Sequence, residues 1–249
     1  MAILNYFPGG GGGGLSSDQN YILFNPFSGL TDSLYPNCFL SSYWSFITDI
    51  KLSNVKYVNP LTSLSNLKTV RITGVGETTM YDSTFTYLNK LEYVEFPDYS
   101  GAIPTWAFGR CFALSSISFP KACAVDSYAF NQCHNLKEIN LPMFSRYVAS
   151  FGFASCSNLS KITLGGSATS NYFKYIGGNA FQRCFALMQL HLKMSEVFAL
   201  SGANQFYSTP ITDSTYTGSF GSIYVPASLL ASYKTATNWT QYSSRMVGV

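Results

Sequence analysis

The chain has 249 residues, of which 47% are hydrophobic and only 11% are charged, so it is long enough and apolar enough to bury a sizeable core. Its net charge of +3 comes from 15 basic and 12 acidic residues with no basic cluster, and this balance argues against a nucleic-acid-binding protein. No run of 18 apolar residues is present, which argues against a membrane-spanning helix.

The first segment, residues 1–14, is an apolar leader followed by six glycines, Gly9–Gly14. It lacks the basic start and long apolar stretch of a secretory signal, so either the protein is not exported by that route or its leader is missing. The glycines have two interpretations. They are a flexible linker, or they are a hinge or packed segment that lets Met1–Pro8 dock into a larger assembly.

Residues 15–40 are expected to form an N-terminal cap, with Tyr21–Phe27 as its strand. An uncovered end of a repeat array exposes its core and its strand edge, and both favour aggregation.

Residues 41–226 carry a repeated phrase, clearest in Ala107–Pro120 and Ala129–Pro142. Counted from the Phe of Ala-Phe as position zero, apolar residues recur at +3, +6, +9 and +11, often with Pro at +12. A period near 23 residues lies in the leucine-rich-repeat range of roughly 20–29 residues. The eight copies begin at Ser41, Leu61, Phe85, Phe108, Phe130, Phe153, Phe181 and Ser214.

The spacing within a copy predicts its local structure. Steps of three residues favour a tight, 3₁₀-like turn, and the alternation between +9 and +11 favours a strand. A second short element is expected between copies. Because one copy cannot bury its apolar face alone, the copies must stack. The predicted fold is therefore a mainly β solenoid with short helical or 3₁₀ turns, a single right-handed leucine-rich-repeat array of about eight coils.

Residues 227–249 are expected to close the array with a capping helix and a tail. Pro226 stands where a helix favours proline at its start, and Leu229, Leu230 and Tyr233 place apolar groups on one face. We expect Trp239 and Tyr242 to cover the last coil.

Four of the six cysteines occupy position +3 of the repeat, where other copies carry Leu64 and Leu88. No CxxC pair is present, which argues against a zinc ribbon or a redox pair. Because a buried free cysteine behaves as a small hydrophobic residue, core packing is favoured over metal or disulfide chemistry, and no metal or cofactor is expected. These four form a predicted structural ladder: Cys111, Cys133, Cys156 and Cys184. Cys38 and Cys123 lie outside it.

The two histidines do not suggest an active site. His134 follows a cysteine in a turn and is expected to be exposed, and strand alternation directs His191 away from the core. Neither has metal-ligand spacing, and no nucleophile-elbow motif accompanies the serines, so no catalytic residue is assigned.

The residues at +8 and +10 of each copy are predicted to face outward from the strands, and we call them the outward row. Polar and varied, without a like-charge run, they suit a partner rich in hydrogen-bonding groups, such as a glycan or a protein, although any solvated sheet face is polar. The candidate ligand-binding residues are Tyr93, Glu95, Ser116, Ser118, Glu138, Asn140, Lys161, Thr163, Gln189 and His191. The row continues outside them with Asp49, Lys51, Thr69, Arg71, Ser222 and Tyr224.

Two stretches lengthen their copies, Gly165–Phe173 and Ser195–Ser219. They are interpreted either as tolerated loops or as recognition elements, because insertions in repeat arrays often gather on one binding face.

The repeated phrase resembles the leucine-rich repeats of the BspA type, found in bacterial surface proteins and in some protist and phage proteins, over about residues 41–226. The resemblance implies a curved solenoid used for adhesion or recognition, with no catalytic residues. The ending from Phe206 to Met246 is similar to closing segments in intestinal Firmicutes and their phages. With the glycine-rich start, it favours a phage virion or prophage origin by analogy.

Three functions follow as hypotheses. The first is a non-enzymatic recognition or adhesion module of a phage tail or similar surface assembly, joined to other subunits through the leader. The second is a BspA-type bacterial cell-surface adhesin. The third is a glycan hydrolase on a repeat scaffold. The first two place the protein in a virion or at a cell surface, with a protein or glycan as its partner and no nucleic acid.

Overall fold

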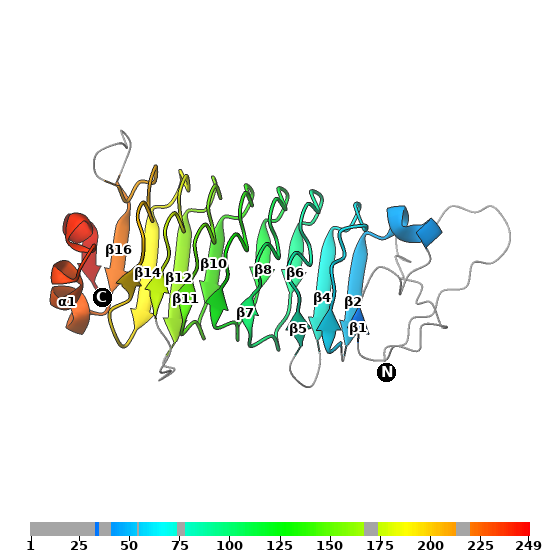
Figure 1. Cartoon of the computed structure of the whole chain (residues 1–249), viewed down its shortest axis with the longest axis horizontal. Helices are drawn as coiled ribbons and strands as arrows, with labels where there is room; N and C mark the ends of the chain where they lie inside the picture. The colour runs from blue at the N-terminus through cyan, green and yellow to red at the C-terminus, as the bar shows by residue number, and fades with distance from the viewer. Residues whose placement is uncertain (1–32, 35–40, 54, 74–77, 167–173, 213–219) are drawn as a thin grey trace.

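The computed structural model describes residues 33–34, 41–53, 55–73, 78–166, 174–212 and 220–249. This part of the chain is an elongated β-solenoid of about eight coils, which lie side by side from β2 at one end to α1 at the other (Figure 1). The predicted fold class is confirmed. The leader, the glycine run, Tyr21–Phe27 and Cys38 lie outside the described residues. No helix in the described ranges is both long and apolar enough to cross a membrane.

The I-x-L steps of successive copies form the main strands, which pair in parallel with their neighbours. They make a four-stranded sheet, β2-β4-β6-β8, and a five-stranded sheet, β10-β12-β14-β16-β17. The strands are β2 (Asp49–Ser53), β4 (Thr69–Thr73), β6 (Tyr93–Glu95), β8 (Ser116–Ser118), β10 (Glu138–Leu141), β12 (Lys161–Gly166), β14 (Gln189–Met194), β16 (Ser222–Val225) and β17 (Met246–Gly248).

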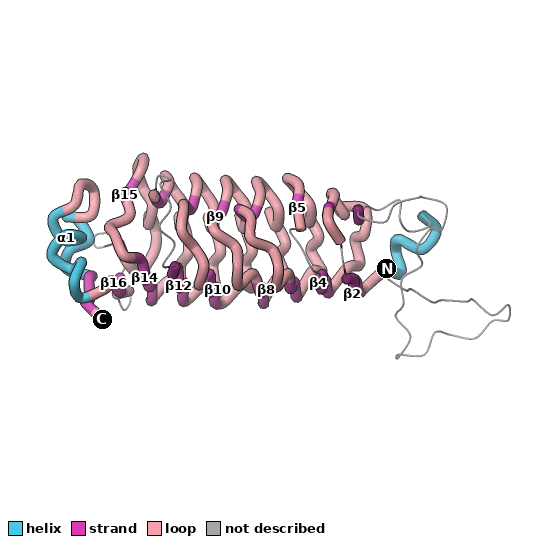
Figure 2. Tube along the Cα trace, turned by 90° about the horizontal axis from the view of Figure 1, so that it is seen from below, coloured by secondary structure: helices cyan, strands magenta, loops and turns pink. Residues whose placement is uncertain are grey.

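The predicted second element of each coil is a two-residue strand. These strands pair in parallel along the side of the solenoid opposite the main strands (Figure 2), in the orders β1-β3-β5 and β7-β9-β11-β13-β15. They are β1 (Ser33–Leu34), β3 (Tyr57–Val58), β5 (Thr79–Met80), β7 (Ala102–Ile103), β9 (Ala124–Val125), β11 (Tyr147–Val148), β13 (Tyr175–Ile176) and β15 (Ala199–Leu200).

The core is built from equivalent side chains stacked one coil above another. The phenylalanines at position zero form one column with neighbouring ring centroids 5.1–5.6 Å apart and rings within 10° of parallel. This arrangement buries large apolar area and adds favourable aromatic contact. The column comprises Phe85, Phe108, Phe130, Phe153, Phe181 and Phe206, all fully buried.

The turn around each position zero is not a continuous 3₁₀ helix. In the copy of Phe108, the amides of Ala107, Gly109 and Cys111 bond within the coil to carbonyls three residues back. The amides of Trp106, Phe108 and Arg110 instead bond to carbonyls of the next coil. Trp106 and Arg110 have φ of 58° and 62°, a left-handed conformation that non-glycine residues seldom adopt. Because of it, successive amides point alternately into their own coil and toward the next coil.

The predicted start of the last copy was wrong. Phe206, not Ser214, joins the phenylalanine column, and the Phe181 amide bonds to the carbonyl of Gln205 beside it. Phe220, predicted as an apolar anchor, is 47% exposed under the guanidinium of Arg245. The predicted insertion 195–219 is therefore shorter, because β15 and the Phe206 turn belong to a regular coil. Residues 167–173 and 213–219 lie outside the described ranges.

The C-terminal segment covers the last coil, as expected. It contains the 3₁₀ helices η3 (Ala227–Leu229) and η4 (Thr240–Arg245) around α1 (Leu230–Thr235), while η2 (Ser41–Phe46) lies at the other end. Trp239 is fully buried against Phe206, and its indole Nε1 donates to the carbonyl of Phe198 at 2.6 Å. The chain then adds β17 to the main sheet, a strand that was not anticipated.

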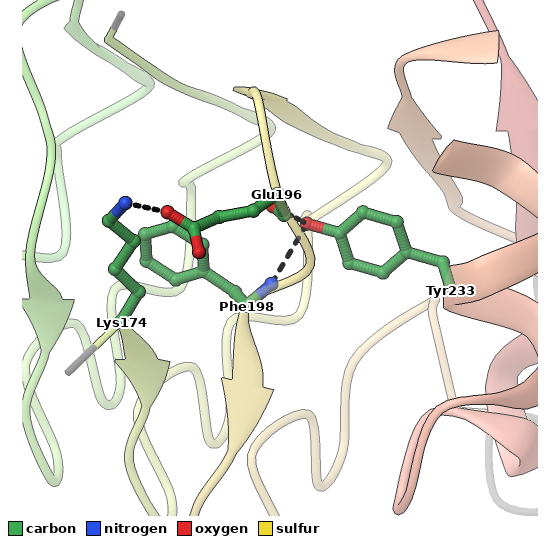
Figure 3. A network of polar contacts seen from close by, with 4 residues as sticks. All are labelled: Lys174, Glu196, Phe198 and Tyr233. Carbon is green, nitrogen blue, oxygen red and sulfur yellow. Dashed lines mark hydrogen bonds and ion pairs between the residues drawn. The ribbon is translucent and has the colours of Figure 1, made fainter. Parts of the chain in front are cut away.

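A polar network joins the cap to the last two coils (Figure 3). The Tyr233 hydroxyl accepts from the Phe198 amide at 3.2 Å and donates to the Glu196 carbonyl at 3.4 Å. The Glu196 side chain in turn pairs with Lys174. The cap thus satisfies backbone groups at the end of the array as well as covering apolar ones.

Replacing Trp239 by Ala is expected to lower the free energy of unfolding by about 3–5 kcal/mol, because it opens a cavity and removes the partner of the Phe198 carbonyl. Urea unfolding followed by circular dichroism measures this. Tyr207→Ala is the control: this tyrosine is 45% exposed, and its loss should cost within about 0.5 kcal/mol. Equal losses would show that the segment does not cap the core.

Candidate binding face

The structure places all ten candidate residues on one face, in register within each of the two main sheets. Glu138 and Asn140 of β10 lie beside Lys161 and Thr163 of β12, which lie beside Gln189 and His191 of β14. Tyr93 and Glu95 of β6 pair in the same way with Ser116 and Ser118 of β8. All ten are exposed or half-buried, whereas the alternate residues of the same strands point inward. One inward residue is an exception: Ile117 of β8 is only partly buried.

The N-terminal part of the outward row is occupied by its own polar contacts. The Arg71 guanidinium lies 3.1 Å from the Glu95 carboxylate, and the Tyr93 hydroxyl donates to the same carboxylate at 2.7 Å. This hydrogen bond raises the pKa of Tyr93. Asp49 accepts from Thr48 at 2.6 Å and from Thr69. The charges of Arg71 and Glu95 are therefore paired within the row.

The main sheet is interrupted between β8 and β10. Other neighbouring main strands are hydrogen-bonded, but these two belong to separate sheets. In the described chain, the backbone hydrogen bond that joins the two coils nearest to these strands runs from the Asn135 amide to the Phe112 carbonyl at 3.3 Å, before either strand begins. The partial exposure of Ile117 lies at this break.

The C-terminal part of the row is hollowed. An open depression of about 510 Å³ is lined by Asn140, Pro142, Thr163, Gly165, Lys193, Met194 and Ser195. A second depression, of about 410 Å³, shares Asn140, Thr163 and Lys193 and extends to Glu138 and Lys161. Gly165 has no side chain and is buried between Pro142 and Lys193, so it forms the floor. We call the two depressions together the ladder hollow.

An aromatic pair borders the ladder hollow. The imidazole of His191 stacks on the ring of Tyr224, with centroids 4.3 Å apart and planes within 7°. On its other side, His191 is the register neighbour of Thr163. Partial burial lowers the pKa of His191, and the positive charges of Lys161 and Lys193 lower it further.

The four ladder cysteines are fully buried. Each thiol donates to the carbonyl of the position-zero phenylalanine one coil earlier, over 3.0–3.1 Å. Burial raises the pKa of the Cys111 thiol, which keeps it protonated as a donor. Leucine at the same position, as in Leu64 and Leu88, fills the space without this bond. In the last coil Thr209 takes the position, fully buried.

No group of three or more His, Cys, Asp or Glu side chains suited to a metal ion occurs in the described ranges. His134, expected to be exposed, is half-buried and stacks on Phe112. Its Nδ1 lies 3.4 Å from the Ser157 hydroxyl, a long contact, and no described carboxylate orients the ring. Cys123 is a half-buried free thiol.

A family model described as the BspA type leucine rich repeat region matches residues 102–228 in six copies. The chain belongs to the BspA-type leucine-rich-repeat family. The matched residues include the break in the sheet and the residues that line the ladder hollow. The resemblance noted in the sequence is confirmed.

Two solved structures are similar to this BspA-type chain. A leucine-rich repeat protein from Bacteroides ovatus is 19% identical, with a TM-score of 0.44, over 64% of this chain and 46% of that one. The present chain therefore spans less than half of that protein. A leucine-rich cell surface protein from Faecalibacterium prausnitzii is 12% identical, with a TM-score of 0.31, over 79% of this chain and 77% of that one. No curated protein matches.

Among the residues that line the ladder hollow past the row, sequence reasoning did not single out Pro142, Lys193 or Met194. Gly165 and Ser195 entered only as the first residues of the two lengthened stretches. Lys193 stands at +12, where other copies have proline, and it follows His191 by two residues on the same strand. Extending the alternation by one more step would have placed it on the outward face.

Replacing Cys133 by Ser is expected to destabilise the fold by about 1–3 kcal/mol, because a more polar group enters the apolar core and its shorter bond to Cβ moves the donor away from the Phe108 carbonyl. Ser118→Ala on the outward row should change stability by less than about 0.5 kcal/mol. Thermal unfolding of both variants gives the comparison. Equal melting temperatures would contradict the assignment of inward and outward positions.

Proposed function

We propose that the chain is a non-enzymatic recognition module whose outward row binds a protein or glycan on a cell surface. The observation that carries the proposal is the row itself, which presents polar side chains of different kinds in register on a rigid sheet. A rigid array loses little conformational entropy when it binds. Its length allows many weak contacts to act at once.

The hydrolase hypothesis has less support. The two histidines are on separate elements, and their side chains contact Ser157 and Gln189 rather than a carboxylate. General acid–base catalysis needs a titratable group placed against the reacting bond, and the described residues offer no such arrangement with a nucleophile. A hydrolysis screen of the glycans that the protein binds tests this hypothesis directly.

The finer form of the proposal places the module in a phage tail or a similar surface assembly. Its support is the sequence from Phe206 to Met246 and the glycine-rich start, and the leader of residues 1–14 would join the module to other subunits. The alternative is a BspA-type adhesin on a bacterial cell. Mass spectrometry of purified virions separates the two. In a virion, deletion of residues 1–14 should leave the circular dichroism spectrum unchanged and abolish incorporation.

Binding by the outward row is tested with a paired set of variants. Asn140→Ala combined with Thr163→Ala removes two polar groups from adjacent coils of the row. Each lost hydrogen bond is worth about 0.5–1.5 kcal/mol, so we expect affinity for a ligand found on a glycan or surface-protein array to fall by roughly tenfold.

Ser127→Ala combined with Ser150→Ala is the matched control. These serines lie in adjacent coils beside the short strands β9 and β11, away from the row, and binding should be unchanged. If the control pair weakens binding and the row pair does not, the recognition face is on the other side of the solenoid.

A further inference from the structure

The ladder hollow brings two lysine side chains into one lining. Lys161 and Lys193 both line it, and neither ammonium group forms an ion pair within the described residues. Elsewhere, Arg71 is paired with Glu95 and Lys121 with Asp98. Glu138 lines the far edge without pairing to Lys161, its register neighbour. The described charged lining therefore carries two cations without ion pairs and one carboxylate, a net charge of about +1.

The spacing of the two lysines is set by the sheet. Lys161 is the register neighbour of Gln189, and Lys193 lies four residues further along the same pair of strands. At a rise of about 3.3 Å per residue, their backbones are about 13 Å apart along the strands. The two lysines therefore leave the sheet four residues apart in register, with Thr163 and His191 between their backbone positions.

The neutral groups that line the hollow are short polar side chains, and Gly165 adds no side chain to them. Asn140, Thr163 and Ser195 offer amide and hydroxyl groups, and Gly165 leaves the backbone surface uncovered. The backbone groups of this sheet are engaged in the strand ladder. An extended peptide, which binds sheets by pairing its backbone with a free edge, finds no free backbone edge between β10 and β14, because the one unpaired edge of β10 faces β8.

We propose that the ladder hollow binds an acidic oligosaccharide, with carboxylates at Lys161 and Lys193 and sugar hydroxyls at Asn140, Thr163 and Ser195. The proposal rests on the recognition function proposed above and names the ligand class for the same face. An oligosaccharide of uronic or sialic acids combines repeated carboxylates with many hydroxyls. Both features match a lining of two separated ammonium groups with neutral donors and acceptors between them.

The experiment measures binding of the intact chain to acidic glycans by calorimetry or biolayer interferometry. The probes are an oligogalacturonate, hyaluronan and polysialic acid. The methyl ester of the oligogalacturonate keeps the sugar and removes the charge, and poly-L-glutamate keeps the charge and removes the sugar. We expect binding to at least one acidic glycan. If the oligogalacturonate binds, its methyl ester should bind at least tenfold more weakly.

Two variants locate the site. Lys161→Gln combined with Lys193→Gln should weaken binding at least tenfold. Lys68→Gln combined with Lys90→Gln removes the same charge from exposed turn residues outside the hollow and should have no effect. Gly165→Ser keeps both lysines but places a side chain on the floor, where its Cβ would lie 3.2 Å from the Lys193 Cβ. Binding measured well below the variant's melting temperature should be weaker, and the melting temperature itself reports the cost of this close contact.

The results separate this proposal from the one on which it rests. The acidic-saccharide proposal is overturned if no acidic glycan binds, if poly-L-glutamate binds as tightly as the best glycan, or if the Lys161 and Lys193 variant binds normally. The wider recognition function survives those outcomes when another glycan or a surface protein binds and Asn140 and Thr163 matter for it. It fails when no ligand's binding responds to changes anywhere on the outward row.

Discussion

The structure depends on one constraint, the requirement that each coil place its apolar side chains directly over those of the coil before it. The phenylalanine column shows this most simply, because its rings repeat at 5.1–5.6 Å, close to the spacing of about 4.8 Å between hydrogen-bonded strands. Sheet pairing and ring stacking therefore favour the same distance between coils. A shift of one residue in any strand would turn its buried side chains to solvent, so the register is strongly specified from coil to coil.

This constraint divides the coil into positions that can vary and positions that cannot. Inward residues such as Ile162 and Leu164 are fully buried, whereas Lys161 and Thr163, which alternate with them, are half-buried on the outward face. Partly exposed positions of this kind tolerate substitution at less cost to folding than the buried ones. The same constraint leaves the last coil with an uncovered apolar end, and the C-terminal segment covers it with Tyr233 and Trp239, both fully buried.

Much of the fold could be predicted from the sequence because the repeat period and the alternation at +9 and +11 are local patterns. The last copy was misplaced because Thr209 stands where a Cys or Leu was expected, and Phe220 offered a false anchor. The left-handed residues Trp106 and Arg110 carry no glycine or asparagine signal. The ladder hollow depends on which residues face each other across strands, above all Gly165 beside Lys193, and such pairing becomes clear only once the register is known.

The stacking of equivalent positions is tested most directly by the reactivity of the thiols. In a Cys38→Ser variant, five cysteines remain, of which four are buried and only Cys123 is half-exposed. Titration of the native protein with a bulky thiol reagent should modify Cys123 at most, and all five thiols should react in denaturant. Rapid modification of Cys111, Cys133, Cys156 or Cys184 in the folded protein would contradict the account, because a residue at position +3 would then face solvent rather than the coil beneath it.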